Sequence, residues 1–273
     1  MMEKFSVCMS VYKNDNSSDF FAAVNSIYKQ TCQPDEIIIV VDGPVPESME
    51  STISELQRLI PIMKVIPLAQ NMGHAIARQT GLDAAQYDYI AIMDSDDIAV
   101  SDRFEKQMAY IEAHPEVDAL GGQIDEFIGD QSNVMGTRIV PQTDAEIKSY
   151  LKSRCPMNLV TVMLKKDSVQ KVGGYIDWYC EEDYYLWVRM VEQGMTFANL
   201  PDSLVNVRVG GEMYQRRGGM KYFKSEAKLQ RYMFKHGIIS FPRYLFNVAG
   251  RFAVQVAMPN TVRSYVFQKL FRR

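Results

Sequence analysis

Short apolar runs alternate along this chain with longer segments whose apolar residues recur every three or four positions. The runs are β-branched and bounded by polar or turn residues, as buried strands are, and the spaced segments have the period of amphipathic helices. Over the first hundred residues the predicted strands are 5–12, 36–44, 63–68 and 89–93, and the predicted helices are 19–30, 46–59 and 73–86. Alternating strands and helices form β-α-β units, so the sequence predicts an α/β fold with a mostly parallel, Rossmann-type sheet flanked by helices.

The pattern continues less regularly after residue 100. We expect helices at about 104–113 and 144–153 and after Glu182, a strand with a bend at 117–128, and a buried strand at 158–164. Residues 129–141 support no assignment.

Polar side chains lie at or directly after the carboxyl ends of the predicted parallel strands. In such sheets ligands bind beyond the carboxyl ends of the strands, which is where Tyr12, Asp42 and Asp94 should lie, with Ser10 just before them. Ordinary turn chemistry is the alternative for Ser10, Tyr12 and Asp42.

Three carboxylates crowd the turn Asp94-Ser95-Asp96-Asp97. Mg²⁺ and Mn²⁺ prefer oxygen ligands and share them with substrate phosphates, so this turn is a candidate metal site. The alternative is a solvated turn that caps the next helix.

The first strand-to-helix turn, residues 10–15, contains no glycine. A dinucleotide fold or a P-loop needs glycines there to admit phosphates, so both are disfavoured. Small residues on helix 73–86 allow it to approach the sheet, which makes Arg78 available to the site. A surface helix arginine is the alternative.

A second acidic pair, Glu182 and Asp183, precedes a helical pattern. One cluster could hold a metal while the other takes a proton. The alternative is capping and dipole stabilisation of the helix.

The composition adds little except at the carboxyl end. The 273 residues are 47% hydrophobic and 23% charged, as in globular proteins, and no run is long enough to span a membrane. No secretory signal is visible at the amino end, so we expect a cytoplasmic protein. From Val205 onward 14 basic residues face 2 acidic ones, against 16 and 31 before it. The basic tail could meet an anionic partner.

In this combination the chain resembles the inverting family 2 glycosyltransferases of the GT-A fold, over residues 5–219. The motifs that carry the resemblance are Ser6-Val7-Cys8-Met9-Ser10-Val11-Tyr12, Val40-Val41-Asp42-Gly43, Asn71-Met72-Gly73 with Ala77-Arg78, Asp94-Ser95-Asp96-Asp97, Gly173-Gly174-Tyr175, and Glu182-Asp183 with Leu186-Trp187.

The resemblance implies a role for each candidate residue. Ser10, Tyr12 and Asp42 would hold the nucleobase and ribose, with Arg78 beside the nucleotide. Asp94 would contact the nucleotide and share with Asp96 an Mn²⁺ or Mg²⁺ ion. Asp183 would be the general base, with Glu182 lining the acceptor side, and direct displacement would invert the anomeric centre. Arg216 and Arg217 would cover the diphosphate, surface charge being their alternative.

The chain departs from the family pattern in four places. Lys13 replaces the usual Asn, and Val41 the first of two Asp residues. No histidine follows in Val207-Arg208-Val209-Gly210-Gly211, and Tyr214-Gln215-Arg216-Arg217 lacks the Trp of processive synthases. The first two departures concern the nucleobase contacts, and the third leaves Asp96 and substrate oxygens to hold the metal. The missing Trp, together with the lack of a membrane-spanning run, favours an enzyme that makes a single transfer.

Residues 220–273 are expected to form a helical, basic and amphipathic extension similar to that of bacterial exopolysaccharide and lipopolysaccharide glycosyltransferases. It would either lie on an anionic membrane surface or pack on the body. The expected function is transfer from a nucleoside-diphosphate sugar, UDP-linked, to a saccharide or lipid-linked saccharide in cell-surface polysaccharide synthesis, with no nucleic-acid partner. The alternatives are a sugar-nucleotide nucleotidyltransferase and a non-catalytic nucleotide-sugar-binding scaffold.

Overall fold

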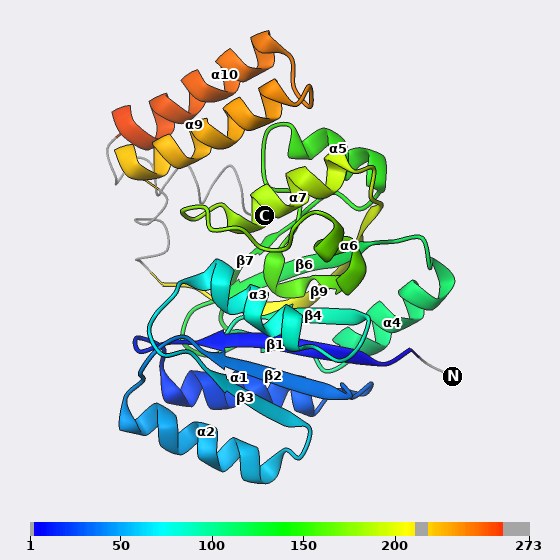
Figure 1. Ribbon diagram of the computed structural model, residues 1–273, viewed down its shortest axis with the longest axis vertical. Helices are drawn as coiled ribbons and strands as arrows, with labels where there is room; N and C mark the ends of the chain where they lie inside the picture. The colour runs from blue at the N-terminus through cyan, green and yellow to red at the C-terminus, as the bar shows by residue number, and fades with distance from the viewer. Residues whose placement is uncertain (1–2, 211–217, 259–273) are drawn as a thin grey trace.

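The computed structural model describes residues 3–210 and 218–258, and a nine-stranded sheet runs through it (Figure 1). The strand order is β3-β2-β1-β4-β8-β6-β9-β5, with β7 paired to β6. The strands are β1 (Phe5–Val11), β2 (Glu36–Val41), β3 (Met63–Pro67), β4 (Tyr89–Met93), β5 (Ile98–Ala99), β6 (Ala119–Phe127), β7 (Val134–Arg138), β8 (Met163–Lys165) and β9 (Phe197–Arg208). The helices are α1 (Ser17–Tyr28), α2 (Glu47–Leu59), α3 (His74–Ala84), α4 (Arg103–Ala113), α5 (Asp144–Leu151), α6 (Lys166–Lys171), α7 (Glu182–Glu192), α9 (Met220–Lys235) and α10 (Phe241–Phe252), with a 3₁₀ turn η1 (Leu159–Thr161) and a π-helical segment η2 (Ala253–Ala257).

The predicted α/β fold is confirmed, and its first half has the predicted pairing. β3, β2, β1 and β4 are parallel neighbours joined by crossover helices. Beyond β4 the sheet is mixed: β6 and β9 are parallel, whereas β8, β7 and β5 pair antiparallel with their neighbours.

The predicted strand at 158–164 is wrong in its first half. There the chain forms η1, and only Met163–Lys165 joins the sheet as β8. Side chains compete with the sheet for backbone groups: Thr161 Oγ1 donates to the carbonyl of Asn158 (2.7 Å), and Asn158 Nδ2 donates to the carbonyl of Gly122 (2.8 Å).

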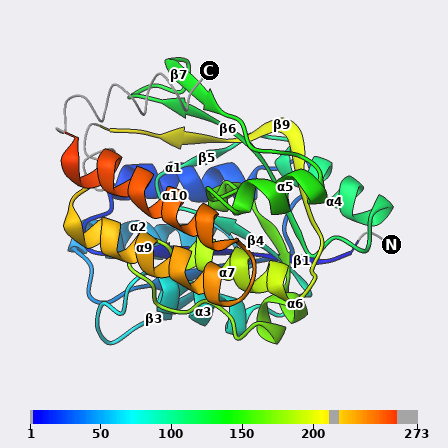
Figure 2. The ribbon, with the colours of Figure 1, turned by 90° about the horizontal axis from the view of Figure 1, so that it is seen from above.

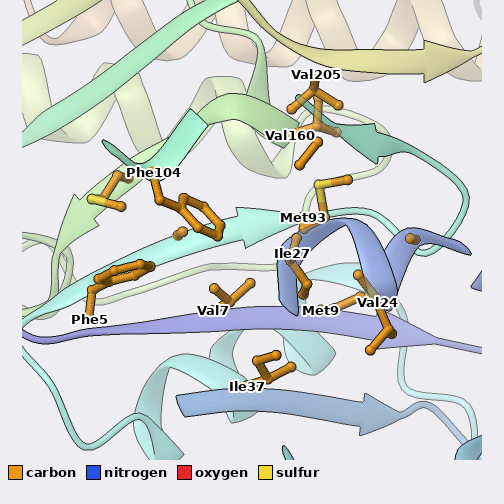
Figure 3. Packing of buried hydrophobic residues seen from close by; sticks show 14 of the residues in the cluster. Phe5, Val7, Met9, Val24, Ile27, Ile37, Met93, Phe104, Val160 and Val205 are labelled. Carbon is orange, nitrogen blue, oxygen red and sulfur yellow. The ribbon is translucent and has the colours of Figure 1, made fainter. Parts of the chain in front are cut away.

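Two hydrophobic cores lie on the two faces of the sheet, because successive side chains of a strand point to opposite sides. Phe5, Val7 and Met9 of β1 pack in the first core with residues of α1, α2 and α4 (Figure 3). Cys8 points into the second core, which contains residues of α3, α5, α6 and α7.

The predicted helical carboxyl-terminal region is present. α9 and α10 lie side by side at one end of the molecule (Figures 1 and 2), and Leu229 and Met233 of α9 join the second core. Among residues 3–210 and 218–258, no helix is both long and apolar enough to cross a membrane.

Candidate functional site

The candidate residues that follow β1, β2 and β4 gather at one edge of the sheet. β1 and β2 pair in register as far as Val11 and Val41, and β1 and β4 as far as Met9 and Met93. Tyr12, Asp42 and Asp94 therefore follow neighbouring strand ends, as the sequence predicts.

Asp42 holds the loop that leads into α3. Its carboxylate accepts hydrogen bonds from the backbone N–H of Met72 (2.6 Å) and Gly73 (3.0 Å) and from Asn71 Nδ2 (2.9 Å). The loop comes this close because Gly43 has a φ of +85° and no side chain: a Cβ there would lie 2.5 Å from the nitrogen of Asn71. Both carboxylate oxygens of Asp42 are thus already engaged within the chain.

The acidic turn after β4 has an alternating burial pattern. Asp94 is half-buried, Ser95 buried, Asp96 exposed and Asp97 buried. The turn does not cap α4, because β5 follows it and α4 begins only at Arg103. The buried Asp97 instead accepts from the backbone N–H of Arg208 (2.9 Å), which ties the turn to the end of β9.

Asp15 is a fifth carboxylate at this edge, beside Asp42, Asp94, Asp96 and Asp97, and it is absent from the candidates predicted from the sequence. Its Oδ2 accepts from the backbone N–H of Tyr12 (3.1 Å) and from Ser95 Oγ (2.8 Å). Burial raises its pKa, and the charge of Asp94 adds to this effect. The feature of the sequence that could have identified Asp15 is its position in the first strand-to-helix turn, which contains no glycine.

Asp96 carries a negative charge that neighbouring groups compensate only in part. Its pKa is raised to about 6 by desolvation and by the charges of Asp94 and Asp15, and Arg208 offsets this only in part. Such a carboxylate cluster fits a hard divalent cation, which would supply the missing positive charge. Among the described residues no three His, Cys, Asp or Glu side chains converge on one point, so Asp94 and Asp96 would need oxygens from a ligand to complete a coordination shell.

Arg78 joins the two acidic clusters. Its side chain is 9% exposed, its Nη2 lies 3.2 Å from Asp94 Oδ1, and its Nη1 lies 2.8 Å from Glu182 Oε1. Burial alone would lower the pKa of Arg78, but Asp94 and Glu182 more than reverse this and raise it, so the guanidinium stays charged. Arg78 is therefore not a surface helix arginine.

Glu182 and Asp183 form the first turn of α7. Asp183 is half-buried, and its Oδ1 accepts from the backbone N–H of Tyr184 (2.7 Å). Cys155 Sγ lies 3.9 Å from the other oxygen, Oδ2. Desolvation and the charge of Glu182 raise the pKa of Asp183, which is the direction that improves a carboxylate as a general base.

The Gly173-Gly174-Tyr175 motif docks on α3 beside Arg78. The backbone N–H of Tyr175 donates to Gln79 Oε1 (2.7 Å), and the carbonyl of Gly174 accepts from Arg189 Nη2 (2.7 Å). Gly174 has a φ of +69°, and a Cβ there would lie 2.1 Å from Gln79 Oε1. The motif thus positions the chain that leads to Glu182.

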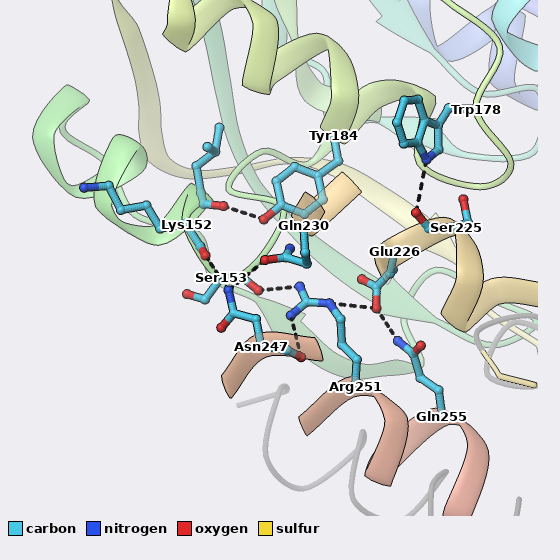
Figure 4. Close-up of polar contacts among 11 residues, drawn as sticks. Lys152, Ser153, Trp178, Tyr184, Ser225, Glu226, Gln230, Asn247, Arg251 and Gln255 are labelled. Atoms are coloured by element: carbon cyan, nitrogen blue, oxygen red, sulfur yellow. Dashed lines mark hydrogen bonds and ion pairs between the residues drawn. The ribbon is translucent and has the colours of Figure 1, made fainter. Parts of the chain in front are cut away.

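Helix α9 fastens residues 178–181, which directly precede the acidic pair. Ser225 Oγ donates to the carbonyl of Tyr179 (2.6 Å). Trp178 Nε1 donates to the carbonyl of Ser225 (3.3 Å), as Figure 4 shows. Lys221 and Lys228 each lie 3.9 Å from the ring centroids of Tyr179 and Trp178, respectively. The carboxyl-terminal region therefore helps to set the start of α7.

Three candidates remain less defined. Ser10 is a half-buried residue of β1 beside the same edge. Arg216 and Arg217 lie outside the described residues.

Arg208 is a further residue of the site that is absent from the candidates predicted from the sequence. It donates from Nε to the carbonyl of Asp96 (3.2 Å) and pairs through Nη2 with Asp19 (2.9 Å). Arg208 thus places positive charge beside the acidic turn.

Known sequences resemble this chain over most of its length. The sequence profile of Glycosyl transferase family 2 matches residues 6–173. An uncharacterized glycosyltransferase of Haemophilus influenzae is 40% identical over 99% of this chain and 100% of its own. The amylovoran biosynthesis glycosyltransferase AmsE of Erwinia amylovora is 37% identical over 83% of this chain and 84% of its own. The UDP-Gal:alpha-D-GlcNAc-diphosphoundecaprenol beta-1,3-galactosyltransferase of Escherichia coli is 35% identical over 99% of this chain and 97% of its own.

Two solved structures share the fold at low sequence identity. Residues 1–349 of S. aureus TarS in complex with UDP-GlcNAc superpose with a TM-score of 0.66 at 17% identity, covering 97% of this chain and 75% of that one. The mannosyltransferase PcManGT of Pyrobaculum calidifontis, in complex with GDP-Man and Mn²⁺, gives a TM-score of 0.65 at 14% identity, covering 99% of this chain and 82% of that one. Both are GT-A glycosyltransferases, and the likeness concerns the fold.

Proposed function

The chain belongs to glycosyltransferase family 2, and from this membership we propose that it transfers a sugar, with inversion, from a UDP-sugar to a saccharide or lipid-linked saccharide. The observation that carries the proposal is the double ion pair of Arg78. One guanidinium contacts Asp94 of the first acidic cluster and Glu182 of the second. A donor that binds over Asp94 and an acceptor that lies beside Glu182 and Asp183 would therefore meet above one buried residue.

The donor side is the edge formed by the ends of β1, β2 and β4. Tyr12 and Ser10 would contact the nucleobase and ribose, and Arg78 and Asp94 the nucleotide. Because both oxygens of Asp42 accept hydrogen bonds from the loop before α3, we assign it to the nucleotide site as a residue that shapes this loop. Arg216 and Arg217 would cover the diphosphate.

Asp96 and Asp94 would hold Mn²⁺ or Mg²⁺ together with the donor's phosphate oxygens. When bound, the cation stabilises negative charge on the diphosphate that leaves the sugar. The partly compensated charge at Asp96 supports this role, as does its raised pKa of about 6.

Asp183 would act as the general base. Its carboxylate takes the proton of the acceptor hydroxyl as the acceptor oxygen forms a bond to the anomeric carbon. The bond from that carbon to the diphosphate breaks on the opposite side, the electron pair leaves with UDP, and the anomeric configuration inverts. Glu182 would line the acceptor side, with its charge balanced by Arg78 at 2.8 Å. The raised pKa of Asp183 suits this step because a stronger base removes the proton more readily.

The printed names of the relatives suggest where this reaction belongs. One relative is named for amylovoran biosynthesis, and another for a galactose transfer to a diphosphoundecaprenol-linked sugar. We place this chain in cell-surface polysaccharide synthesis at the inner face of the cell membrane. Residues 1–219 would form the catalytic GT-A domain, and residues 220–273 would contact the membrane peripherally.

The proposal is tested by screening nucleotide sugars for donor hydrolysis in the presence and absence of Mn²⁺. We expect one UDP-sugar to be hydrolysed with a dependence on the metal. A protein that binds UDP-sugars but neither hydrolyses nor transfers them with any acceptor would instead be a scaffold. Release of diphosphate from a nucleoside triphosphate and a sugar phosphate would indicate a nucleotidyltransferase, although the first turn lacks the glycines that such an enzyme needs.

A further inference from the structure

Helix α10 is amphipathic, but it turns its polar side towards the protein. Its buried residue is Asn247, and half-buried Arg251 and buried Gln255 of η2 follow at four-residue intervals on the same side. The opposite side exposes four large apolar residues: Phe241 (53%), Leu245 (50%), Phe246 (75%) and Phe252 (45%). A surface helix of a globular protein normally has the reverse arrangement.

A polar network fixes this inverted orientation (Figure 4). Asn247 Nδ2 donates to the carbonyl of Lys152 (2.8 Å) and to Gln230 Oε1 (2.8 Å). Arg251 Nη2 donates to the carbonyl of Ser153 (2.7 Å), and its Nε pairs with Glu226 Oε2 (3.0 Å). Rotating α10 to bury its apolar side would leave these groups unpaired in the interior, at a free-energy cost that opposes the rotation.

We propose that the outward side of α10, defined by Phe241, Leu245, Phe246 and Phe252, is a docking surface for an anionic phospholipid bilayer. The inference deepens the membrane contact of the proposed function and rests on it. Apolar side chains of a helix that lies in the plane of the interface enter the boundary between headgroups and acyl chains.

Charge complementarity selects a bilayer as the occupant. Residues 220–273 contain 11 Lys and Arg and one acidic residue, Glu226, and Glu226 is engaged by Arg251. Anionic lipid attracts such a segment. A second copy that docked through the same surface would bring two strongly basic regions together, which disfavours it.

A groove of about 550 Å³ beside this surface offers a place for headgroups. It lies between α5, the α9–α10 connection and α10, and its walls include Lys152, Arg243 and Phe246. Both basic residues thus stand next to the most exposed apolar side chain of α10, as binding of a phosphate-bearing headgroup requires.

The test uses the full chain and vesicles of phosphatidylcholine with and without phosphatidylglycerol. The variant F241S/L245S/F252S removes three exposed side chains. Phe241 and Phe252 also contact the rings of Phe234 and Phe223 on α9, with centroid distances of 5.5 and 5.4 Å, so circular dichroism and urea unfolding first establish that the variant is folded. The control L59S/I128S/I139S removes apolar residues of similar exposure (56%, 47% and 52%) from the body. We expect the wild type and the control to sediment with the anionic vesicles, and the α10 variant to lose at least about ten-fold in partitioning.

Three results would overturn the proposal. The α10 variant could bind the vesicles as the wild type does, or the folded wild type could fail to bind anionic vesicles at all. Light scattering could also show that the wild type is a dimer and the α10 variant a monomer, while neither of the two binds vesicles. That result would identify a second copy as the occupant of the surface. Donor hydrolysis in solution separates the two proposals. If the wild type hydrolyses the donor but does not bind vesicles, the docking surface alone is refuted. If the wild type, the α10 variant and the control all fail to hydrolyse the donor, the proposed function is refuted.

Discussion

Arg78 Nη1 lies 2.8 Å from Glu182 Oε1, although 104 positions separate the two residues in the chain. The same guanidinium also contacts Asp94. The two contacts of Arg78 join the acidic turn after β4 and the acidic first turn of α7 in one site. They also explain how several carboxylates can share an edge of the sheet, because a buried charge of opposite sign offsets part of their repulsion.

Replacing Arg78 by Met should destabilise the protein strongly. Glu182 would lose its partner in a largely buried setting and Asp94 in a half-buried one, and we expect the free energy of unfolding to fall by about 3 kcal/mol. Urea unfolding measures this, with Arg58→Met on the exposed side of α2 as control, where the change should stay within about 0.5 kcal/mol. Equal effects of the two substitutions would mean that Arg78 has no bridging role.

Asp96→Ala should abolish the metal dependence of UDP binding. The substitution removes the carboxylate that we assign to the cation, so titration calorimetry should show the same UDP affinity with and without Mn²⁺. In the wild type, and in the control Asp88→Asn at the opposite end of β4, Mn²⁺ should tighten binding. A variant that keeps the wild-type response to Mn²⁺ would sink the metal assignment.

Asp96→Asn should stabilise the metal-free protein above pH 6 and leave it unchanged near pH 4. In the folded protein the pKa of Asp96 is raised from 3.8 to about 6. The folded state therefore binds this proton more tightly than the unfolded state does, and the resulting stability is lost as pH rises through that interval. Because the side chain is exposed, we expect a gain of no more than about 1 kcal/mol. Urea unfolding of both proteins from pH 4 to pH 8 measures the difference, and a variant less stable than the wild type at pH 8 would contradict the assignment.

Ser225→Ala should lower kcat more than it changes the KM for the donor. Ser225 Oγ donates to the carbonyl of Tyr179 (2.6 Å), and this contact helps α9 to hold residues 178–181 ahead of Asp183. Loss of the contact should lower the free energy of unfolding by about 1 kcal/mol and let the carboxylate of Asp183 depart from its catalytic position. Ser54→Ala on the exposed side of α2 is the control. A variant with reduced stability but unchanged kcat would show that α9 supports the fold and not the base.

The sequence was sufficient to predict the carboxyl ends of the first four strands to within three residues: the predicted ends are 12, 44, 68 and 93, and the strands β1 to β4 end at 11, 41, 67 and 93. Apolar runs such as 89–93 mark them directly, and parallel pairing then brings Tyr12, Asp42 and Asp94 to one edge. The sequence could not show what these groups contact. Asp42 is engaged by the loop before α3, and Asp97 by the backbone of Arg208, which lies 111 positions away. Such contacts depend on how β9 enters the sheet, which no local pattern reveals.

The side of α10 that faces the protein could not be predicted from the spacing of its apolar residues either. The spacing of Phe241, Leu245 and Phe252 shows that one side of the helix is apolar. A surface helix normally buries its apolar side, so the spacing would predict the opposite orientation. The exposure of this side follows from the partners of Asn247 and Arg251, which come from α9 and from the chain directly after α5.

The central claim is that Asp183 is the base of an inverting transfer, and Asp183→Asn tests it most directly. Asn cannot accept the proton, so sugar transfer should fall by at least about a hundred-fold, while calorimetry finds UDP binding unchanged. Asp177→Asn, at an exposed carboxylate six residues earlier, should transfer at the wild-type rate. Transfer by Asp183→Asn at a rate close to that of the wild type would contradict the account.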